Sequence, residues 1–357
     1  MRLRDALTCP YKDLDNVNAL VSISEILTGL VARRELSEAS LRWMLTEMMA
    51  GRCGEAEAAA FLVALRMKGE STREIAWAAQ VLREHMVRWD AGRANILDTC
   101  GTGGDGSGTF NISTATALVV AGAGVPVVKH GNRSVSSRTG SADVLQALGV
   151  KIDGDAEFAR RCLAEANFAF CFAPQFHPAL KHVAVVRRKL GVPTIFNCLG
   201  PLANPAGARR QIIGVGRADL LDLMAGALGQ LDVEHAFVIC SCDGLDEVSL
   251  SAPTMVREVR GSSIRGFEWT PVEFGLDNSP LAELSAAHAD ASAGMIKKVL
   301  AREEGAPYRI VLANAAAALL AAEQASTLLE GVELARAAIK SGRALQVLTN
   351  LQRLSGT

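Results

Sequence analysis

Five glycines in eight residues follow a short apolar segment of the chain. The apolar segment covers residues 96–100, the glycines lie within residues 101–108, and an Ala-rich stretch begins soon afterwards. Glycine lets the backbone approach a ligand closely and turn its N–H groups toward it, and the N-terminus of a following helix adds a partial positive charge. This pattern predicts a cradle for an anionic ligand at the end of a strand.

Two nucleotide-binding patterns compete for these glycines. Gly101, Gly103 and Gly106 match the GxGxxG fingerprint, which expects an acidic residue at the end of the next strand. Here that strand, expected at residues 125–128, runs into Lys129. A P-loop needs a Lys followed by Ser or Thr directly after the glycines, and the chain lacks this pair at that place. Both interpretations are therefore disfavoured.

A second polar segment occupies the tip of that expected strand. Its sequence, KHGNRSVSS at residues 129–137, carries cations, an amide and several hydroxyls. Together such groups can hold the oxygens of more than one phosphoryl group. Hydroxyls at a junction between loop and helix also cap helices, so we expect Ser113 and Ser141 to cap a helix and bind a ligand.

Two adjacent carboxylates follow a further expected strand at residues 236–240. They are Asp246 and Glu247, in the segment CDGLDE. Mg²⁺ takes oxygen ligands and is commonly held by one or two carboxylates together with substrate phosphates. Alone, the pair would be more typical of a solvated acidic turn. Beside the two phosphate-binding segments, it is a candidate metal site.

The elements that position these residues alternate from about residue 93 onward between β-branched runs and Ala/Leu-rich stretches. Such alternation is typical of an α/β fold with a mostly parallel central sheet flanked by helices, and its active site lies beyond the carboxyl ends of the strands. The expected strands cover residues 96–100, 125–128, 168–172, 194–196, 211–215, 236–240 and 309–312.

The first ninety residues show helical periodicity instead. A stripe of apolar residues follows Ser37, and Ser71 with Glu74 forms a capping box ahead of another stripe. We therefore expect an N-terminal extension at residues 1–20, a small all-helical domain at 21–92 and a larger α/β domain at 93–357. A basic helical segment at about 177–200 is expected to join the helical domain in space.

Composition excludes several classes of function. The 357 residues carry 37 Lys+Arg and 38 Asp+Glu, which leaves no basic footprint for a nucleic acid or an anionic membrane. The apolar runs are shorter than the roughly 20 residues of a membrane span, and the N-terminus has no signal-peptide pattern. The eight cysteines form no CxxC pair, so we expect reduced side chains. These features predict a cytoplasmic enzyme that acts on small molecules, with no nucleic acid and no membrane as partner.

The order of the motifs resembles the anthranilate phosphoribosyltransferase family of tryptophan biosynthesis. GTGGDGSGTFNIST at 101–114 and KHGNRSVSSRTGSADVLQALG at 129–149 carry the likeness, supported by FLVALRMKGES at 61–71, TIFNCLGPLANPA at 194–206 and DGLDE at 243–247. The resemblance extends from about residue 20 to the C-terminus. It implies a nucleoside phosphorylase-like fold and transfer of the phosphoribosyl group of phosphoribosyl pyrophosphate (PRPP) to the amine of anthranilate. It further implies Mg²⁺, with two ions per subunit, and a homodimer joined through the helical part.

The resemblance also assigns residues to roles. The implied metal ligands are Ser113, Asp246 and Glu247. The implied anthranilate contacts are Gly101, His130, Asn132, His177 and Arg187, and the planar guanidinium of Arg187 suits the carboxylate of the acceptor. The implied PRPP contacts are Gly101, Gly104, Asp105, Thr109, Asn111, Ile112, Ser113, Thr114, Lys129, His130, Gly131, Asn132, Arg133, Ser134, Val135, Ser136, Ser137 and Ser141.

The sequence offers no credible pair of nucleophile and base, and we assign no general base. Lys129, His130 and Arg187 are expected to act by positioning and electrostatics, while C1′ of PRPP gains oxocarbenium character and the neutral arylamine attacks it. We also expect the helix that contains Arg187 to pack with the N-terminal helices, so that hinge closure brings acceptor and donor together. Two alternatives stay open: a pyrimidine nucleoside phosphorylase-like enzyme, and a nucleic-acid-binding paralogue without transferase activity.

Overall fold

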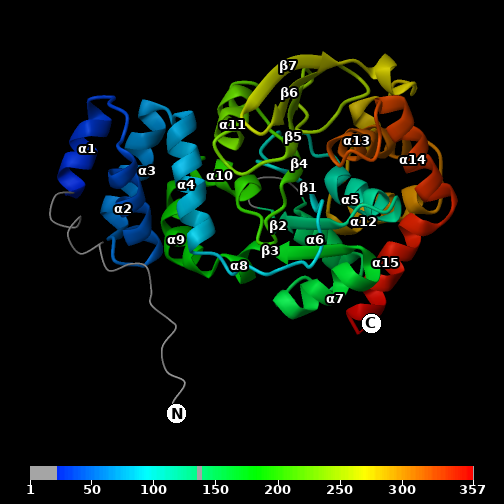
Figure 1. The fold of residues 1–357 in the computed structure, drawn as a ribbon, viewed down its shortest axis with the longest axis horizontal. Helices are drawn as coiled ribbons and strands as arrows, with labels where there is room; N and C mark the ends of the chain where they lie inside the picture. The colour runs from blue at the N-terminus through cyan, green and yellow to red at the C-terminus, as the bar shows by residue number, and fades with distance from the viewer. Residues whose placement is uncertain (1–21, 135–138, 357) are drawn as a thin grey trace, which may run out of the picture.

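The computed structural model describes residues 22–134 and 139–356, which form a helical part and a larger α/β part (Figure 1). Seven strands build one sheet: β1 (Leu97–Gly101), β2 (Val127–Gly131), β3 (Phe168–Phe172), β4 (Arg210–Gly214), β5 (His235–Ser241), β6 (Thr254–Arg260) and β7 (Ser263–Trp269). The helices are α1 (Ile23–Val31), α2 (Glu38–Met49), α3 (Glu55–Lys68), α4 (Thr72–Glu84), α5 (Ile112–Gly122), α6 (Ser141–Ala147), α7 (Ala156–Ala166), α8 (Ala173–Phe176), α9 (Lys181–Leu190), α10 (Phe196–Leu199), α11 (Leu220–Leu228), α12 (Ala289–Leu300), α13 (Ala306–Ala321), α14 (Leu328–Lys340) and α15 (Arg343–Leu354).

The sheet is mostly parallel. Its strand order is β3-β2-β1-β4-β5-β6-β7, and β1 to β5 run parallel while β6 and β7 are antiparallel. This confirms the expected α/β fold with a small helical domain in front of it. From β1, the chain adds β2 and β3 on one side of the sheet and then β4 to β7 on the other side. β1 and β4 are therefore neighbours at the point where the strand order changes direction, which is where such sheets bind ligands.

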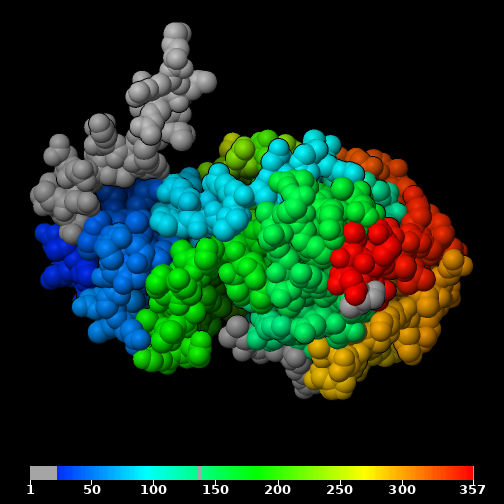
Figure 2. Space-filling view, turned by 90° about the horizontal axis from the view of Figure 1, so that it is seen from below, coloured from blue at the N-terminus to red at the C-terminus, as the bar shows by residue number. Residues whose placement is uncertain are grey.

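The helical part consists of α1 to α4 together with α9. Helix α9 is more than a hundred residues away from α2 in sequence, yet it packs against α2 and α3. Figure 2 shows its green surface against the blue surface of those helices. The expected N-caps are present: Ser37 caps α2, and Ser71 and Glu74 form the capping box of α4.

The two faces of the sheet belong to different apolar cores. On β5, Phe237 and Ile239 point into the core built with α5 and α13. Ala236 and Val238 point into the second core, which also contains α11 and the apolar residues of the helical part. Helix α4 packs against α11. The helical part is thus continuous with one face of the sheet, because the two-residue period of a strand sends alternate side chains to opposite faces.

Two of the expected strands are wrong. Residues 309–312 lie inside α13, because a short β-branched run cannot be told from a buried helix by periodicity, and Gly305 and Pro307 begin a helix there. Residues 194–196 turn into α10, because the Asn197 side chain accepts a hydrogen bond of 3.0 Å from the Thr194 backbone N–H. The hairpin of β6 and β7 was not expected from the sequence.

Candidate active site

The candidate site lies at the carboxyl ends of β1, β2, β4 and β5. Gly101 ends β1, Gly131 ends β2 and Gly214 ends β4, so the loops that follow these strands meet at one edge of the sheet. Gly101 and Gly214 are direct neighbours across the β1 and β4 ladder, and the backbone N–H of Thr102 donates to Gly214 O at 2.9 Å. The polar segments picked out from the sequence are therefore neighbours in space.

The glycine loop has the conformation that requires glycine. Gly103, Gly104, Gly106 and Gly108 all have positive φ, between 65° and 86°. A methyl group added to Gly103, Gly104 or Gly106 would meet no atom within 4 Å. The loop backbone is thus bent in a way that L-residues rarely adopt, and open space adjoins these three glycines.

Helix α5 begins directly after this loop and points its N-terminus at the same edge. Asn111 is the N-cap, and its side chain accepts a hydrogen bond of 3.0 Å from Thr114 N. The expectation that Ser113 caps this helix is wrong: Ser113 is in the first turn, and its hydroxyl donates to Asn111 Oδ1 at 3.3 Å. Likewise Gly140, not Ser141, is the N-cap of α6. In both cases the cap is the last non-helical residue, and each Ser already lies within the helix.

Lys129 joins the two phosphate-binding segments. It is buried, and its Nζ donates to Ser113 Oγ at 3.0 Å, to Thr99 Oγ1 at 3.5 Å and to the Thr99 carbonyl. Burial lowers the pKa of Lys129, and the neighbouring Asp98 carboxylate opposes that shift. A buried ammonium held only by neutral oxygens is well placed to gain from an anionic ligand.

Three carboxylates gather beside the glycine loop. Burial and the charge of Asp105 raise the pKa of Asp246 to about 7. Burial and the charge of Asp246 raise the pKa of Glu247 well above its ordinary value. Asp105 itself has a buried carboxylate oxygen, Oδ2, without a hydrogen-bond partner. A methyl group on Gly101 would lie 3.3 Å from Asp246 Oδ2, so the Asp246 carboxylate lies beside the first residue of the glycine loop.

This donor set fits a divalent cation. Within the described residues no group of three or more His, Cys, Asp or Glu side chains forms a complete metal cage. Mg²⁺ rarely uses such a cage, since it keeps several waters and shares substrate phosphates. Asp246 and Glu247, whose pKa values are raised, and Asp105, with its unpaired buried oxygen, are hard oxygen donors whose charged forms a divalent cation would stabilise.

Two buried histidines lie at the other side of Lys129. The rings of His130 and His177 are 4.8 Å apart, centroid to centroid. His130 Nδ1–H donates to Gly200 O at 3.0 Å, which leaves its Nε2 as an acceptor without a partner. Burial lowers the pKa of His130 to about 4 and that of His177 to about 3. Both rings are therefore neutral at physiological pH.

Arg187 lies in the helical part, in the last turn of α9. Its guanidinium carbon is 5.5 Å from the centroid of the Phe196 ring, and Nη2 donates to Asn197 Oδ1 at 3.5 Å. Burial lowers its pKa, whereas the neighbouring Arg188 is exposed. A partly buried guanidinium with only one weak hydrogen bond has donors free for a carboxylate, because guanidinium carries five N–H groups.

The segment after β2 is organised by a residue that the sequence analysis passed over. Asp143 accepts hydrogen bonds from Arg133 Nη1 at 2.7 Å, Ser134 N at 3.0 Å and Gly140 N at 3.1 Å. The Arg133 guanidinium is therefore engaged within the protein. Asn132 is exposed. Val135, Ser136 and Ser137, all assigned to PRPP above, lie outside the described residues.

A second network that the sequence analysis missed lies under His130. Asp98 is buried on β1 and accepts from His130 N at 3.2 Å and from Asn204 Nδ2 at 2.8 Å. Asn204 Nδ2 also donates to Val128 O at 2.8 Å. This network fastens the loop after α10 onto the sheet. Its signal in the sequence is a lone acid inside an otherwise apolar strand, which needs partners when buried.

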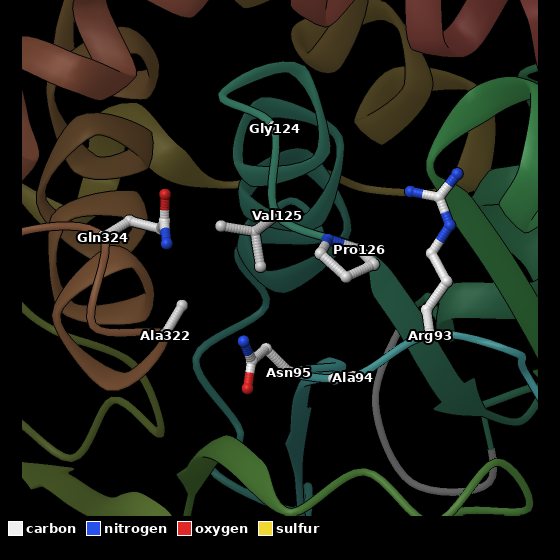
Figure 3. Close-up of a pocket in the computed structure, with 8 residues that line it drawn as sticks. All are labelled: Arg93, Ala94, Asn95, Gly124, Val125, Pro126, Ala322 and Gln324. Carbon is white, nitrogen blue, oxygen red and sulfur yellow. The ribbon is translucent and has the colours of Figure 1, made fainter.

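A cavity of about 350 Å³ lies away from this site, at the opposite edge of the sheet (Figure 3). It is lined in part by Asn95, Gly124 and Gln324, beside the N-terminal ends of β1 and β2. None of the residues assigned above lines it. No helix in the described part of the chain is long and apolar enough to span a membrane.

Comparison with known proteins gives a consistent picture. Residues 93–345 match the glycosyl transferase family, a/b domain, and residues 24–86 match its helical bundle domain. Anthranilate phosphoribosyltransferase of Thermomicrobium roseum is 50% identical over 337 residues, which cover 93% of this chain and 97% of the relative.

Solved structures agree with the sequence matches. The enzyme of that name from Thermus thermophilus superposes with a TM-score of 0.86 at 39% identity, covering 93% of this chain and 99% of its own. The enzyme from Saccharomyces cerevisiae, in complex with PRPP and Mg, superposes with a TM-score of 0.86 at 28% identity, covering 94% and 98%.

Proposed function

This chain belongs to the anthranilate phosphoribosyltransferase family, and we propose how its residues divide the work of that reaction. The enzyme transfers the 5-phosphoribosyl group of PRPP to the amine of anthranilate, giving N-(5-phosphoribosyl)anthranilate and pyrophosphate. The observation that carries the proposal is the meeting of an open glycine cradle, a buried Lys129 and the Asp246 and Glu247 carboxylates at one sheet edge.

The α/β part holds the donor. The pyrophosphate and 5′-phosphate groups of PRPP are met by backbone N–H groups of the loop at 101–108, by the N-terminus of α5 and by Lys129. Ser113 serves twice in this proposal, because its hydroxyl already contacts Lys129 and also faces the same anion. The remaining PRPP contacts are those assigned from the family resemblance.

Magnesium binds with the donor. We propose that Asp246 and Glu247, with Ser113, hold two ions per subunit together with the pyrophosphate oxygens. Held there by Asp246, Glu247 and Ser113, Mg²⁺ would supply positive charge to stabilise the pyrophosphate leaving group. Support comes from the raised pKa values of the two carboxylates and the unpaired Asp105 oxygen.

The acceptor is held from the helical side. Arg187 takes the carboxylate of anthranilate, and Phe196 beneath the guanidinium keeps it in place. Gly101, His130, Asn132 and His177 surround the ring and amine in this proposal. The exposure of Arg188 supports Arg187 as the contact, since a partly buried guanidinium loses less to competing water than an exposed one.

No side chain needs to act as a general base. The pKa values of about 4 and about 3 make His130 and His177 poor proton acceptors at neutral pH. An arylamine is uncharged there and attacks C1′ as it stands, while the site binds, orients and neutralises. The proton leaves afterwards to water or to a nearby carboxylate.

Several features of the assembled enzyme belong to the same proposal. We propose a cytoplasmic homodimer joined through the helical part, in which the helical domain and the α/β domain close over the substrates. The seven described cysteines are all free, as is usual in a reducing compartment. Val31 and Met67, on the packed helices α1 and α3, are 78% and 74% exposed, so the helical part presents two large apolar side chains that a second copy of the chain can cover.

A direct assay tests the reaction. The protein is incubated with PRPP, Mg²⁺ and anthranilate, and the loss of anthranilate fluorescence is followed together with pyrophosphate release. Equimolar loss of anthranilate and release of pyrophosphate is expected. Turnover of a pyrimidine nucleoside with inorganic phosphate, without turnover of anthranilate, would instead support the phosphorylase alternative.

A further inference from the structure

One buried asparagine stands in the middle of a helix that is otherwise apolar. Asn314 is 1% exposed, and it lies in α13 between Leu312 and a run of alanines. Asparagine is a poor helix-interior residue and costs free energy when buried without partners. Ala or Leu would stabilise a buried helix position better than Asn, so the Asn314 side chain must make compensating hydrogen bonds.

At this position Asn314 hydrogen-bonds to Val248, which directly follows the turn that carries Asp246 and Glu247. Asn314 Oδ1 accepts from Val248 N at 2.9 Å, and its Nδ2 donates to Val248 O at 3.0 Å and to Ile310 O at 2.9 Å. Val248 directly follows Glu247 and is fully buried. The carboxamide thus satisfies both backbone groups of a residue that belongs to no strand, as a neighbouring strand would do.

The same turn also lies directly against Gly214. A methyl group on Gly214 would overlap the Asp246 carbonyl oxygen. Gly214 also neighbours Gly101, the first residue of the glycine loop. The turn that carries Asp246 and Glu247 is therefore held at two points, against a glycine at the end of β4 and by a carboxamide on α13, with no room to move closer to Gly214.

We propose that Asn314 is a positioning residue for the metal-binding carboxylates Asp246 and Glu247. The proposal rests on the metal role given to those carboxylates above. By fixing both backbone groups of Val248, Asn314 sets the direction in which the Glu247 side chain leaves the turn. Residues that orient metal ligands in this way affect metal affinity by about 10- to 100-fold when they are removed.

The test measures PRPP binding by calorimetry at a series of Mg²⁺ concentrations, in the full-length protein. Asn314→Ala is expected to raise the Mg²⁺ concentration required for half-maximal PRPP affinity by about tenfold or more. The affinity for anthranilate and the melting temperature report on the acceptor side and on the fold. A role in stability alone would lower the melting temperature and leave the Mg²⁺ requirement unchanged.

Asn167→Ala is the control, at the opposite edge of the sheet. Like Asn314, Asn167 donates to two backbone carbonyls, Ala121 O at 3.1 Å and Val125 O at 2.8 Å, but its Oδ1 accepts from the Arg93 side chain and it is only partly buried. Asn314→Ser provides a milder variant if the Ala variant does not fold. Its hydroxyl can satisfy Ile310 O within the helix, while Val248 loses both partners.

Glu247→Gln tests the metal site independently of the positioning role of Asn314. If Glu247→Gln raises the Mg²⁺ requirement and the Asn314 variants do not, the positioning role is wrong and the metal site stands. If Glu247→Gln leaves the requirement unchanged, the metal site is wrong and the inference falls with it. An equal rise in the Asn314 and Asn167 variants would also overturn the inference, because it would reflect general destabilisation.

Discussion

Lys129 on β2 donates a hydrogen bond of 3.0 Å to Ser113 in the first turn of α5. This contact links the two segments that the sequence singles out for phosphate binding. Because Lys129 also donates to Thr99 on β1, one ammonium ties two neighbouring strands and a helix N-terminus together before any ligand arrives. Its donors are thus oriented in advance, which reduces the cost of ordering the site on binding.

Replacing Lys129 by Met removes this ammonium at similar volume. We expect PRPP affinity to fall by a factor that corresponds to roughly 2–5 kcal/mol, because a buried charged contact to an anion is lost. Anthranilate affinity should change much less. Calorimetric titration with each substrate measures both, and an unchanged PRPP affinity would show that Lys129 does not face the donor.

Removing both metal-site carboxylates, in an Asp246→Ala, Glu247→Ala double variant, should abolish turnover without unfolding the protein. Burial raises both pKa values, with a further contribution from Asp105 at Asp246 and from Asp246 at Glu247, so the variant no longer buries two carboxyl groups that are costly to ionise. The melting temperature should therefore hold or rise while Mg²⁺-dependent activity disappears. Wild-type turnover in this variant would contradict the metal assignment.

Arg187→Ala should weaken anthranilate binding far more than PRPP binding. The loss of a charge-assisted bidentate contact in a partly dry site is worth roughly 2–4 kcal/mol, which is tens to hundreds of fold in affinity. The exposed neighbour provides the control, since Arg188→Ala removes the same charge from the same helix turn. The reverse pattern, with a silent Arg187→Ala and a damaging Arg188→Ala, would mean that the wrong arginine has been assigned.

Acid should destabilise the fold through His177. Its pKa of about 3 in the folded protein lies below the ordinary value of 6.5, so the unfolded chain takes up the proton first as the pH falls. Stability that is present at pH 7 is then lost progressively below about pH 6.5. Neither ring nitrogen makes a hydrogen bond of good geometry, so His177→Phe should fold normally at pH 7.

Between pH 7 and pH 5, the free energy of unfolding of the wild type should fall by roughly 2 kcal/mol more than that of His177→Phe. Chemical denaturation at the two pH values measures this change. His130 acts in the same direction and Asp98, with a pKa raised to about 6 by burial, acts in the opposite one, so only the comparison with the wild type is informative. The exposed His182→Gln serves as the control, and equal pH dependence of His177→Phe and the wild type would refute the prediction.

The dimer is tested at its exposed apolar residues. Met67→Glu and Val31→Glu place charges on α1 and α3, and they should convert a homodimer into a monomer while the melting of each subunit stays cooperative. Val272→Glu, at an 84% exposed position near α14, should leave the dimer intact. Sedimentation at micromolar concentration distinguishes these outcomes, and a wild-type monomer would contradict the proposal directly.

The local chemistry of the site could be predicted from the sequence. The run GTGGDGSG predicts a tightly bent loop, because only glycine readily adopts the positive φ values found at Gly103, Gly104 and Gly106. The parallel strands at 168–172 and 236–240, and the capping box of Ser71 and Glu74, are also local and were predicted correctly. Such features depend on neighbours within a few positions along the chain.

Only the tertiary structure decided which distant residues serve that chemistry. Asn314 lies 66 positions from Val248, and Asn204 lies 106 positions from Asp98. Nothing in an Ala-rich run or in a loop indicates which backbone group a carboxamide will reach. The same holds for residues 309–312, whose β-branched side chains fit a strand or a buried helix equally well until packing selects one. Burial is a property of the whole fold, and burial determines which polar groups must find partners and which pKa values shift.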